Sequence, residues 1–121
     1  MKNIHFKASE VEYNEAIDGE IVQISFDEDP EQDPFDRTKC YVMISQNYEF
    51  PGTATVEWHD GESDDGGSEV LRYRLNSDLF ELTTTDGVTF RVQHDCRGKT
   101  FTQIQEFLQR EFGNSKQNLH N

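Results

Sequence analysis

Alternating apolar and polar residues dominate the stretch from residue 66 to residue 93, in three short runs separated by turn residues. A period of two is the pattern of a strand with one buried face, so each run predicts a β-strand. The segments 76–78 (Asn-Ser-Asp) and 86–87 (Asp-Gly) are turn signals between the runs. Connections this short cannot join parallel strands, so the pattern predicts an antiparallel meander. Its expected buried face comprises Leu71, Tyr73, Leu75, Phe80, Leu82, Val88, Phe90 and Val92.

The apolar residues of segment 100–112 have helical spacing instead. Thr100 and Gln103 fit a capping box at the start of this helix, and Gly113 is expected to end it in a left-handed conformation. A sheet with one apolar face needs a cover, and we expect the helix to provide it. The apolar stripe comprises Phe101, Ile104, Leu108 and Phe112, with Phe107 beside it.

The first half of the chain is read in the same way. Alternation favours strands at residues 3–8, 20–26, 39–46 and 53–59, while residues 9–17 show no clean period and are expected to form a loop or an irregular turn. Segment 27–36 contains two prolines and six acids, and segment 60–67 contains acids and three glycines, so both are expected to be solvated loops. The predicted fold class is α+β, an antiparallel sheet of about six strands packed by one C-terminal helix.

The length of 121 residues suits one domain, which we place at residues 1–113, followed by a flexible polar tail at 114–121. Only 33% of the residues are apolar, but nine Phe, four Tyr and one Trp give this share enough bulk for a core. No run is long enough to span a membrane, and the first residues lack the apolar segment of a signal peptide. The expected location is the cytoplasm.

Negative charge is concentrated in one part of the sequence. The formal charge of the chain is −13, and residues 8–71 hold 18 acids against two bases, Arg37 and Lys39. One interpretation is that these acids keep the protein soluble. The other is a negative surface that attracts a basic partner protein, while nucleic acid is disfavoured because its phosphates are repelled.

Candidate catalytic, cofactor and metal residues do not emerge from the sequence. Cys96 follows His94 by two residues, too far for a dependable nucleophile and base, and the four histidines show no zinc spacing. A calcium reading that starts at Asp27 fails, because its sixth position is Gln32 instead of glycine and its twelfth is Thr38 instead of glutamate. Cys40 and Cys96 are expected to be small buried residues in a reducing compartment. We therefore predict no enzyme and no cofactor.

Binding to a partner protein is the function that the pattern of aromatic and acidic residues favours. Aromatic side chains beside acids are typical anchors of protein interfaces. The predicted aromatic anchors are Tyr48, Phe50 and Trp58. The predicted acidic contacts are Asp27, Glu28, Asp29, Glu31 and Asp33 in the first loop, and Asp60, Glu62, Asp64 and Asp65 in the second.

The order of features from residue 40 to residue 112 resembles a known family. The segments that carry the resemblance are Tyr-Val-Met-Ile-Ser-Gln at 41–46, Val-Glu-Trp at 56–58, and Gly-Gly at 66–67 leading into the meander at 70–79. This pattern resembles family ten of the immunity proteins of bacterial polymorphic toxin systems. The resemblance implies a small cytoplasmic protein that binds a cognate toxin and neutralises it. The first 39 residues match no motif of that family.

Two other function classes stay open from the sequence. A generic acidic interaction module or subunit would bind a housekeeping partner instead of a toxin. A small enzyme or ligand carrier would need a closed pocket with convergent polar groups.

Overall fold

The computed structural model describes residues 2–28, 39–50 and 52–113, which form eight strands and one helix. Most of the first predicted acidic loop and the predicted tail therefore lie outside the described residues. The elements are β1 (Lys2–Lys7), β2 (Glu10–Ala16), β3 (Ile21–Asp27), β4 (Cys40–Asn47), β5 (Thr55–Asp60), β6 (Asp64–Leu75), β7 (Leu79–Thr84), β8 (Val88–Gln93) and α1 (Gly98–Phe112).

The strands are hydrogen-bonded in the order β1-β8-β7-β6-β5-β4-β3-β2. Neighbours are antiparallel except β1 and β8, which are parallel. The α+β class and a mostly antiparallel sheet are thus confirmed, whereas the prediction of about six strands is wrong in number, and the β1–β8 pair makes the sheet mixed. The rule that short connections give antiparallel strands applies to the meander, but β1 joins β8 from the other end of the chain.

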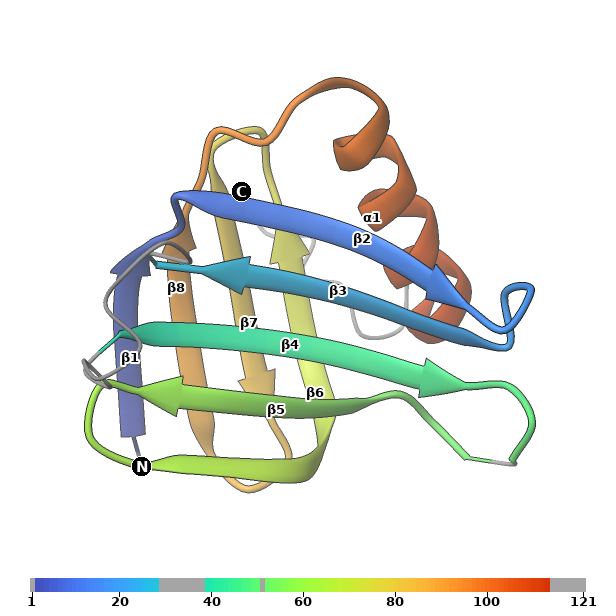
Figure 1. The fold of residues 1–121 in the computed structure, drawn as a ribbon. Helices are drawn as coiled ribbons and strands as arrows, with labels where there is room; N and C mark the ends of the chain where they lie inside the picture. Colours follow the sequence, from blue (N-terminus) through green and yellow to red (C-terminus); the bar gives the residue numbers. More distant parts are fainter. Residues whose placement is uncertain (1, 29–38, 51, 114–121) are drawn as a thin grey trace.

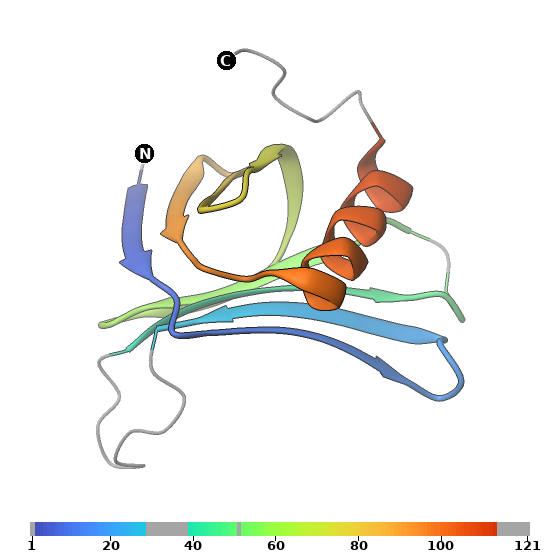
Figure 2. The same cartoon turned by 90° about the horizontal axis from the view of Figure 1, so that it is seen from above.

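Strand β6 divides the sheet into two layers. Its residues 64–69 pair with β5 and its residues 70–75 pair with β7, with a register shift between Val70 and Arg72. Such a bulge bends a strand, which lets β6 continue from one layer into the other. We call β1, β8, β7 and residues 70–75 sheet A, and residues 64–69 with β5, β4, β3 and β2 sheet B (Figure 1). Seen from above, sheet B is one layer, and sheet A and α1 lie side by side over it (Figure 2).

A tight corner joins the outer strands of the two sheets. The Ala8 amide donates to the Gln93 carbonyl of sheet A at 2.8 Å, and the next amide, of Ser9, donates to the Asp27 carbonyl of sheet B at 2.8 Å. Ala8 is buried at this point. The chain thus passes from β1 to β2 without losing backbone hydrogen bonds.

Aromatic pairs connect the layers through the core. Phe26 of β3 stacks on Phe80 of β7, with ring centroids 4.5 Å apart, and Trp58 of β5 meets Phe90 of β8 edge-on at 6.0 Å. The inward residues predicted for β7 and β8 are all buried, and in β3 the alternate residues Val22, Ile24 and Phe26 are buried as well. Each sheet therefore covers much of the other.

The helix covers a different surface from the one predicted. It lies beside sheet A over sheet B, and its buried side chains are Ile104, Phe107, Leu108 and Phe112 (Figure 2). It begins at Gly98, two residues before the expected start. Its N-cap is Arg97, which makes no side-chain capping bond, so the predicted capping box is wrong. Gly113 ends the helix with a φ of 61°, as expected for a glycine at this position.

Three local predictions in the strands are wrong. Residues 10–16 form the edge strand β2, although Glu15 interrupts the alternation of Val11 and Tyr13, because β3 supplies their backbone partners. Residues 64–67 begin β6 instead of forming a flexible loop, since they pair with β5. Leu71 is 47% exposed because the bulge shifts the inward positions to Val70 and Tyr73.

Candidate protein-binding surface

The outward side of sheet B carries a continuous set of carboxylates. Alternate residues of β3 are buried, so the residues between them point outward, and the pairing registers place the outward residues of the other strands beside them. Neither lysine nor arginine occurs within the strands β2, β3, β4 and β5 or in residues 64–69 of β6. We call this surface the acidic face. Its acids are Glu10, Glu12, Asp27, Glu57, Asp64 and Glu69.

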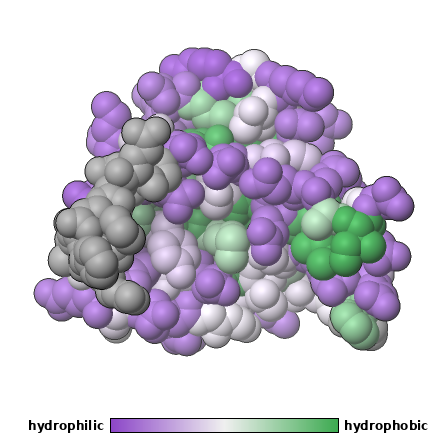
Figure 3. All heavy atoms as spheres, in the orientation of Figure 1, coloured by the Kyte–Doolittle hydropathy of each residue, from purple (hydrophilic) through white to green (hydrophobic). Residues whose placement is uncertain are grey.

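The middle of the acidic face is less polar. Tyr41 and Met43 of β4 are half-buried there, and Tyr41 stacks against His59 of β5 with ring centroids 6.1 Å apart. The Tyr41 hydroxyl donates to Glu57 Oε2 at 3.4 Å. Figure 3 looks onto this side and shows hydrophilic side chains around a paler centre, with a hydrophobic group at one end of the strands. The surface thus combines charge with an amphipathic centre, a composition suited to protein recognition.

Like charges on this face perturb one another. A hydrogen bond with Glu12, followed by repulsion between the two carboxylates, raises the pKa of Glu10. Burial raises the pKa of Asp27, and the charge of Glu10, its direct cross-strand partner, raises it further against a hydrogen bond from Ser25. Like charges directly opposite each other destabilise a sheet. The acidic face therefore reduces the stability of the free protein at neutral pH.

Replacement of Asp27 by asparagine should stabilise the free protein. We expect Asp27→Asn to raise the free energy of unfolding at pH 7 by about 0.2–1 kcal/mol, the usual range for a cross-strand pair. The raised pKa of Asp27 in the folded state means that folding disfavours its ionised form. Protonation removes this penalty, so the gain in the free energy of unfolding should shrink as the pH falls through the raised pKa, which lies above the ordinary Asp value of about 3.9. Urea denaturation across this pH range measures the effect. Asp78→Asn, in the exposed β6–β7 turn, is the control, and equal gains in both variants would contradict the prediction.

The outward side of sheet A has the opposite charge. Its registers place Arg72, Arg74, Arg91 and Lys7 on one surface with a single carboxylate, Glu81. Glu81 is within ion-pair distance of Arg74 and lies 3.3 Å from Arg91. The charge asymmetry of the sequence thus becomes a difference between two faces, because residues 8–69 build sheet B and later residues build most of sheet A.

The carboxylate of Asp60 does not belong to the acidic face. It lies 2.5 Å from Lys2 Nζ and accepts the amides of Glu62 and Ser63 at 2.9 and 2.7 Å. The bond from Lys2, followed by the backbone bonds, holds the pKa of Asp60 well below its usual range. Asp60 therefore links β1 to the β5–β6 turn, while its role as a partner contact stays a prediction.

The other predicted contacts are dispersed. Trp58 is only 5% exposed and packs on Phe90, so it is a core residue and not a surface anchor. Glu28 accepts the Cys40 amide at 3.0 Å, which gives it a structural role. Glu62 and Asp65 are exposed at the β5–β6 end of sheet B. Of the predicted acids, Asp27 and Asp64 lie on the acidic face, while Asp29, Glu31 and Asp33 lie outside the described residues.

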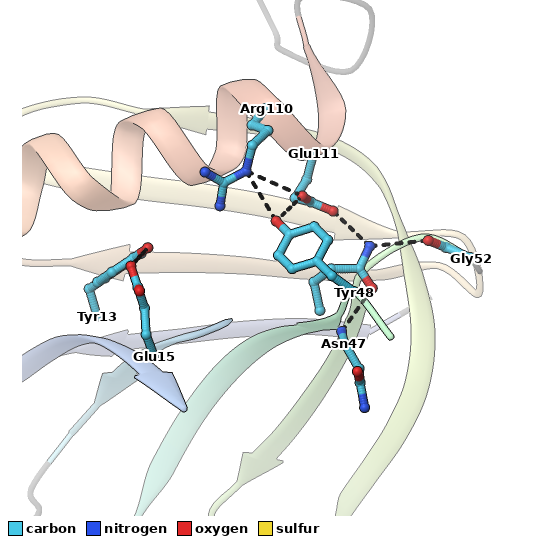
Figure 4. A network of polar contacts seen from close by, with 8 residues as sticks. Tyr13, Glu15, Asn47, Tyr48, Gly52, Arg110 and Glu111 are labelled. Atoms are coloured by element: carbon cyan, nitrogen blue, oxygen red, sulfur yellow. Dashed lines mark hydrogen bonds and ion pairs between the residues drawn. The ribbon is translucent and has the colours of Figure 1, made fainter. Parts of the chain in front are cut away.

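Tyr48 and Phe50 are exposed at the opposite end of sheet B, on the β4–β5 loop, and so do not stand beside residues 60–65. Tyr48 belongs to a polar network with α1 (Figure 4). Its hydroxyl donates to Glu111 Oε2 and accepts from Arg110 Nε at 3.1 Å. Gln46 Nε2 donates to both Glu111 Oε1, at 2.8 Å, and the Gly52 carbonyl, at 3.1 Å. The network attaches this loop to the helix.

The neighbouring β2–β3 turn is strained. Ile17 and Asp18 both have a φ of 53°, and the Gly19 amide donates to the Ala16 carbonyl across them at 3.2 Å. Turns of this kind prefer Asn-Gly at the central positions, and the Asp18-Gly19 signal is displaced from them by one residue. A left-handed conformation costs an ordinary residue about 1–2 kcal/mol, and for a β-branched residue it is an outlier.

The residues considered for nucleophilic chemistry have structural partners. Burial lowers the pKa of His94, whose Nε2 lies 2.9 Å from the Asn76 carbonyl and whose Nδ1 accepts the Cys96 amide at 3.1 Å. Both cysteines are free thiols. Burial, with the charges of Glu28 and Asp60, raises the pKa of Cys40 to about 11, and burial also raises that of Cys96. Both thiols are therefore protonated at neutral pH.

In residues 2–28, 39–50 and 52–113, no group of three or more His, Cys, Asp or Glu side chains is arranged to hold a metal ion. The helix in this part of the chain is too short and too polar to cross a bilayer.

Sequence reasoning missed several members of the acidic face. Glu10 and Glu12 were placed in a loop, so their alignment with Asp27 was not foreseen. The alternation around Val56 did place Glu57 on the outward side, which was a usable signal for that residue. Register between strands, which brings all six acids together, is not encoded in any one segment.

Comparisons of this chain with protein-family models, with curated proteins and with solved structures find no match.

Proposed function

We propose that this protein is a cytoplasmic immunity protein that binds a cognate bacterial toxin and neutralises it through the acidic face. The observation that carries the proposal is the division of charge between the two sheets. Six carboxylates and no lysine or arginine occupy the outward side of sheet B, whereas sheet A presents four cations. The resemblance to immunity proteins supports the same conclusion.

The division of charge gives the acidic face a direct mechanism. A surface of one sign attracts an oppositely charged protein over a distance of about one Debye length, roughly 10 Å at 0.1 M salt, and orients it during approach. Contact then places cations of the toxin among carboxylates that repel one another, so binding relieves the repulsion between Glu10 and Asp27. A toxin that uses a basic cleft to hold its substrate loses that cleft to the acidic face.

Reversal of charge on the acidic face tests the proposal. The probe is the purified product of the gene adjacent to the one that encodes this chain. We expect the triple variant Glu12→Lys, Glu57→Lys and Glu69→Lys to associate at least about tenfold more slowly at low salt, because steering changes association rates by 10-fold or more. The difference should largely disappear at about 1 M salt, where the Debye length is about 3 Å.

The control carries the same change in net charge elsewhere. Asp78→Lys, Asp95→Lys and Glu106→Lys alter a turn, a linker and the exposed side of α1. This control should associate at nearly the rate of the wild-type chain and should still rescue cells that express the neighbouring protein. Equal slowing in both triple variants would refute the acidic face as the binding surface. Binding to a housekeeping protein without rescue would favour a generic acidic interaction module.

A further inference from the structure

We propose that the two loops at the far end of sheet B carry an apolar anchor, which enters an apolar pocket with a cationic rim on the same partner. The anchor consists of Ile17, Tyr48 and Phe50, and we call it the tip patch. This inference rests on the proposed function and specifies a second part of the interface.

The tip patch is exposed and apolar. Within the described residues, four large apolar side chains are exposed, and three of them are Ile17 at 63%, Phe50 at 63% and Tyr48 at 42%. They lie on two adjacent turns, because the Tyr48 amide donates to the Glu20 carbonyl at 2.7 Å and Ile21 pairs with Asn47. Both turns project at the same end of sheet B, where the hydrophobic group appears in Figure 3 (Figures 1 and 3).

The backbone of the β2–β3 turn does not explain why position 17 holds isoleucine. The φ of 53° favours glycine or asparagine, and the exposed side chain gains little from the core. Strained residues of this kind concentrate at ligand-binding positions, where another requirement outweighs the backbone preference. An apolar side chain needed by a partner would meet that requirement.

The β4–β5 loop, which carries Tyr48 and Phe50 of the tip patch, is also held in place before binding. Glu111 accepts from Tyr48 and Gln46, and Arg110 lies over the Tyr48 ring with its guanidinium carbon 5.5 Å from the centroid (Figure 4). The Gly52 carbonyl accepts from the same Gln46 side chain. A preorganised loop loses less conformational entropy on binding, which is typical of an interface anchor.

The charges around the tip patch identify its occupant. Glu15, Asp18, Glu20 and Glu49 lie on the same two hairpins. An anionic membrane or the tip of a second copy would be repelled by these carboxylates. A protein pocket with an apolar floor and lysine or arginine at its rim complements both the side chains and the charge, and is continuous with the partner expected on the acidic face.

The test compares dissociation rates and stability of the same variants. The probe is the purified adjacent-gene product used for the acidic face. We expect Ile17→Asn and Phe50→Ser each to speed dissociation by about ten- to thirtyfold, a change that persists at high salt because the contact is apolar. Asparagine tolerates the left-handed conformation, so Ile17→Asn should also raise the melting temperature of the free chain by about 2–6 °C. A residue that served only the fold would lower it.

Two controls separate the anchor from general effects. Ile17→Val keeps an apolar β-branched side chain and should retain slow dissociation. Leu79→Ser removes a half-buried apolar side chain from the other end of the molecule, since Leu79 pairs with Gln93 beside the Ala8 corner, and should leave dissociation unchanged.

Each outcome has a defined meaning. If the wild-type chain binds with salt-dependent association and both tip variants dissociate at the wild-type rate, this inference is overturned and the proposed function stands. A change in the oligomeric state of the free chain in the tip variants would assign the patch to a second copy and also overturn it. If the wild-type chain does not bind the adjacent-gene product, the proposed function fails, and the inference fails with it.

Discussion

Phe80→Ala is expected to lower the free energy of unfolding by about 3–5 kcal/mol, the usual cost of removing a buried phenylalanine. Phe80 is fully buried and stacks on Phe26 at a centroid distance of 4.5 Å, so the ring joins sheet A to sheet B. Truncation leaves a cavity between two sheets that are held by many other contacts, and such a site cannot collapse to fill it. Urea denaturation followed by circular dichroism measures the loss as a lower midpoint with an unchanged slope.

Phe50→Ala is the matched control for this experiment. The same side chain is removed from a position that is 63% exposed, so we expect a change within about 0.5 kcal/mol. If both variants lost the same stability, the two sheets would not share the core that the Phe26–Phe80 stack defines.

Trp58→Ala should have an effect of similar size, about 3–5 kcal/mol. The ring is 5% exposed, lies edge-on to Phe90 at 6.0 Å and is covered by the Lys2 ammonium 5.6 Å from its centroid. The loss should appear in stability alone. The affinity of the folded fraction for the partner should stay unchanged, because a side chain inside the core does not reach an interface.

Trp58→Phe is the milder comparison. It keeps most of the apolar volume and removes Nε1, which is buried without a hydrogen-bond partner in the described part of the chain. We expect a change below about 1.5 kcal/mol for this swap. A marked loss of affinity in fully folded Trp58→Phe would restore Trp58 as a binding residue and contradict its assignment to the core.

Two features of the free protein reduce its stability without serving the fold. The facing carboxylates of Glu10 and Asp27 repel each other, and Ile17 occupies a left-handed conformation. Selection commonly keeps such costs where binding needs them. The stabilising effects expected for Asp27→Asn and Ile17→Asn would therefore support the proposal that a partner uses these two positions.

Local pattern was sufficient for the elements with clean alternation. The turn signals at 76–78 and 86–87 place both ends of β7 and the start of β8 to within one residue, because inward residues such as Phe80 and Phe90 alternate with polar ones next to these turns. Pattern failed for β2, whose few apolar residues form an edge, and for residues 64–67, whose glycines and acids become a strand only through pairing with β5. In both segments the strand is stabilised mainly by its neighbour.

The candidate surface was predicted only in part for a related reason. The sequence showed that acids concentrate before residue 71 and that Tyr48 and Phe50 stand out as aromatic residues in a loop. The sequence did not show that Trp58 lies in the core instead of serving as an exposed anchor. It also did not show that the Asp60 carboxylate is paired with Lys2 instead of being free. Those distinctions depend on contacts between residues far apart in the chain.

By itself the amino-acid order determined the α+β class, the inward residues of the regular strands, the apolar stripe of the helix and the excess of acid in one part of the chain. Periodicity and charge are properties of neighbouring residues, so no folded context is needed to read them. Only the tertiary structure decided that eight strands divide into two layers, that six carboxylates share one face, and that Ile17 and Phe50 project together. The physical reason is that strand register and layer packing are set by long-range hydrogen bonds and core contacts, which no single segment contains.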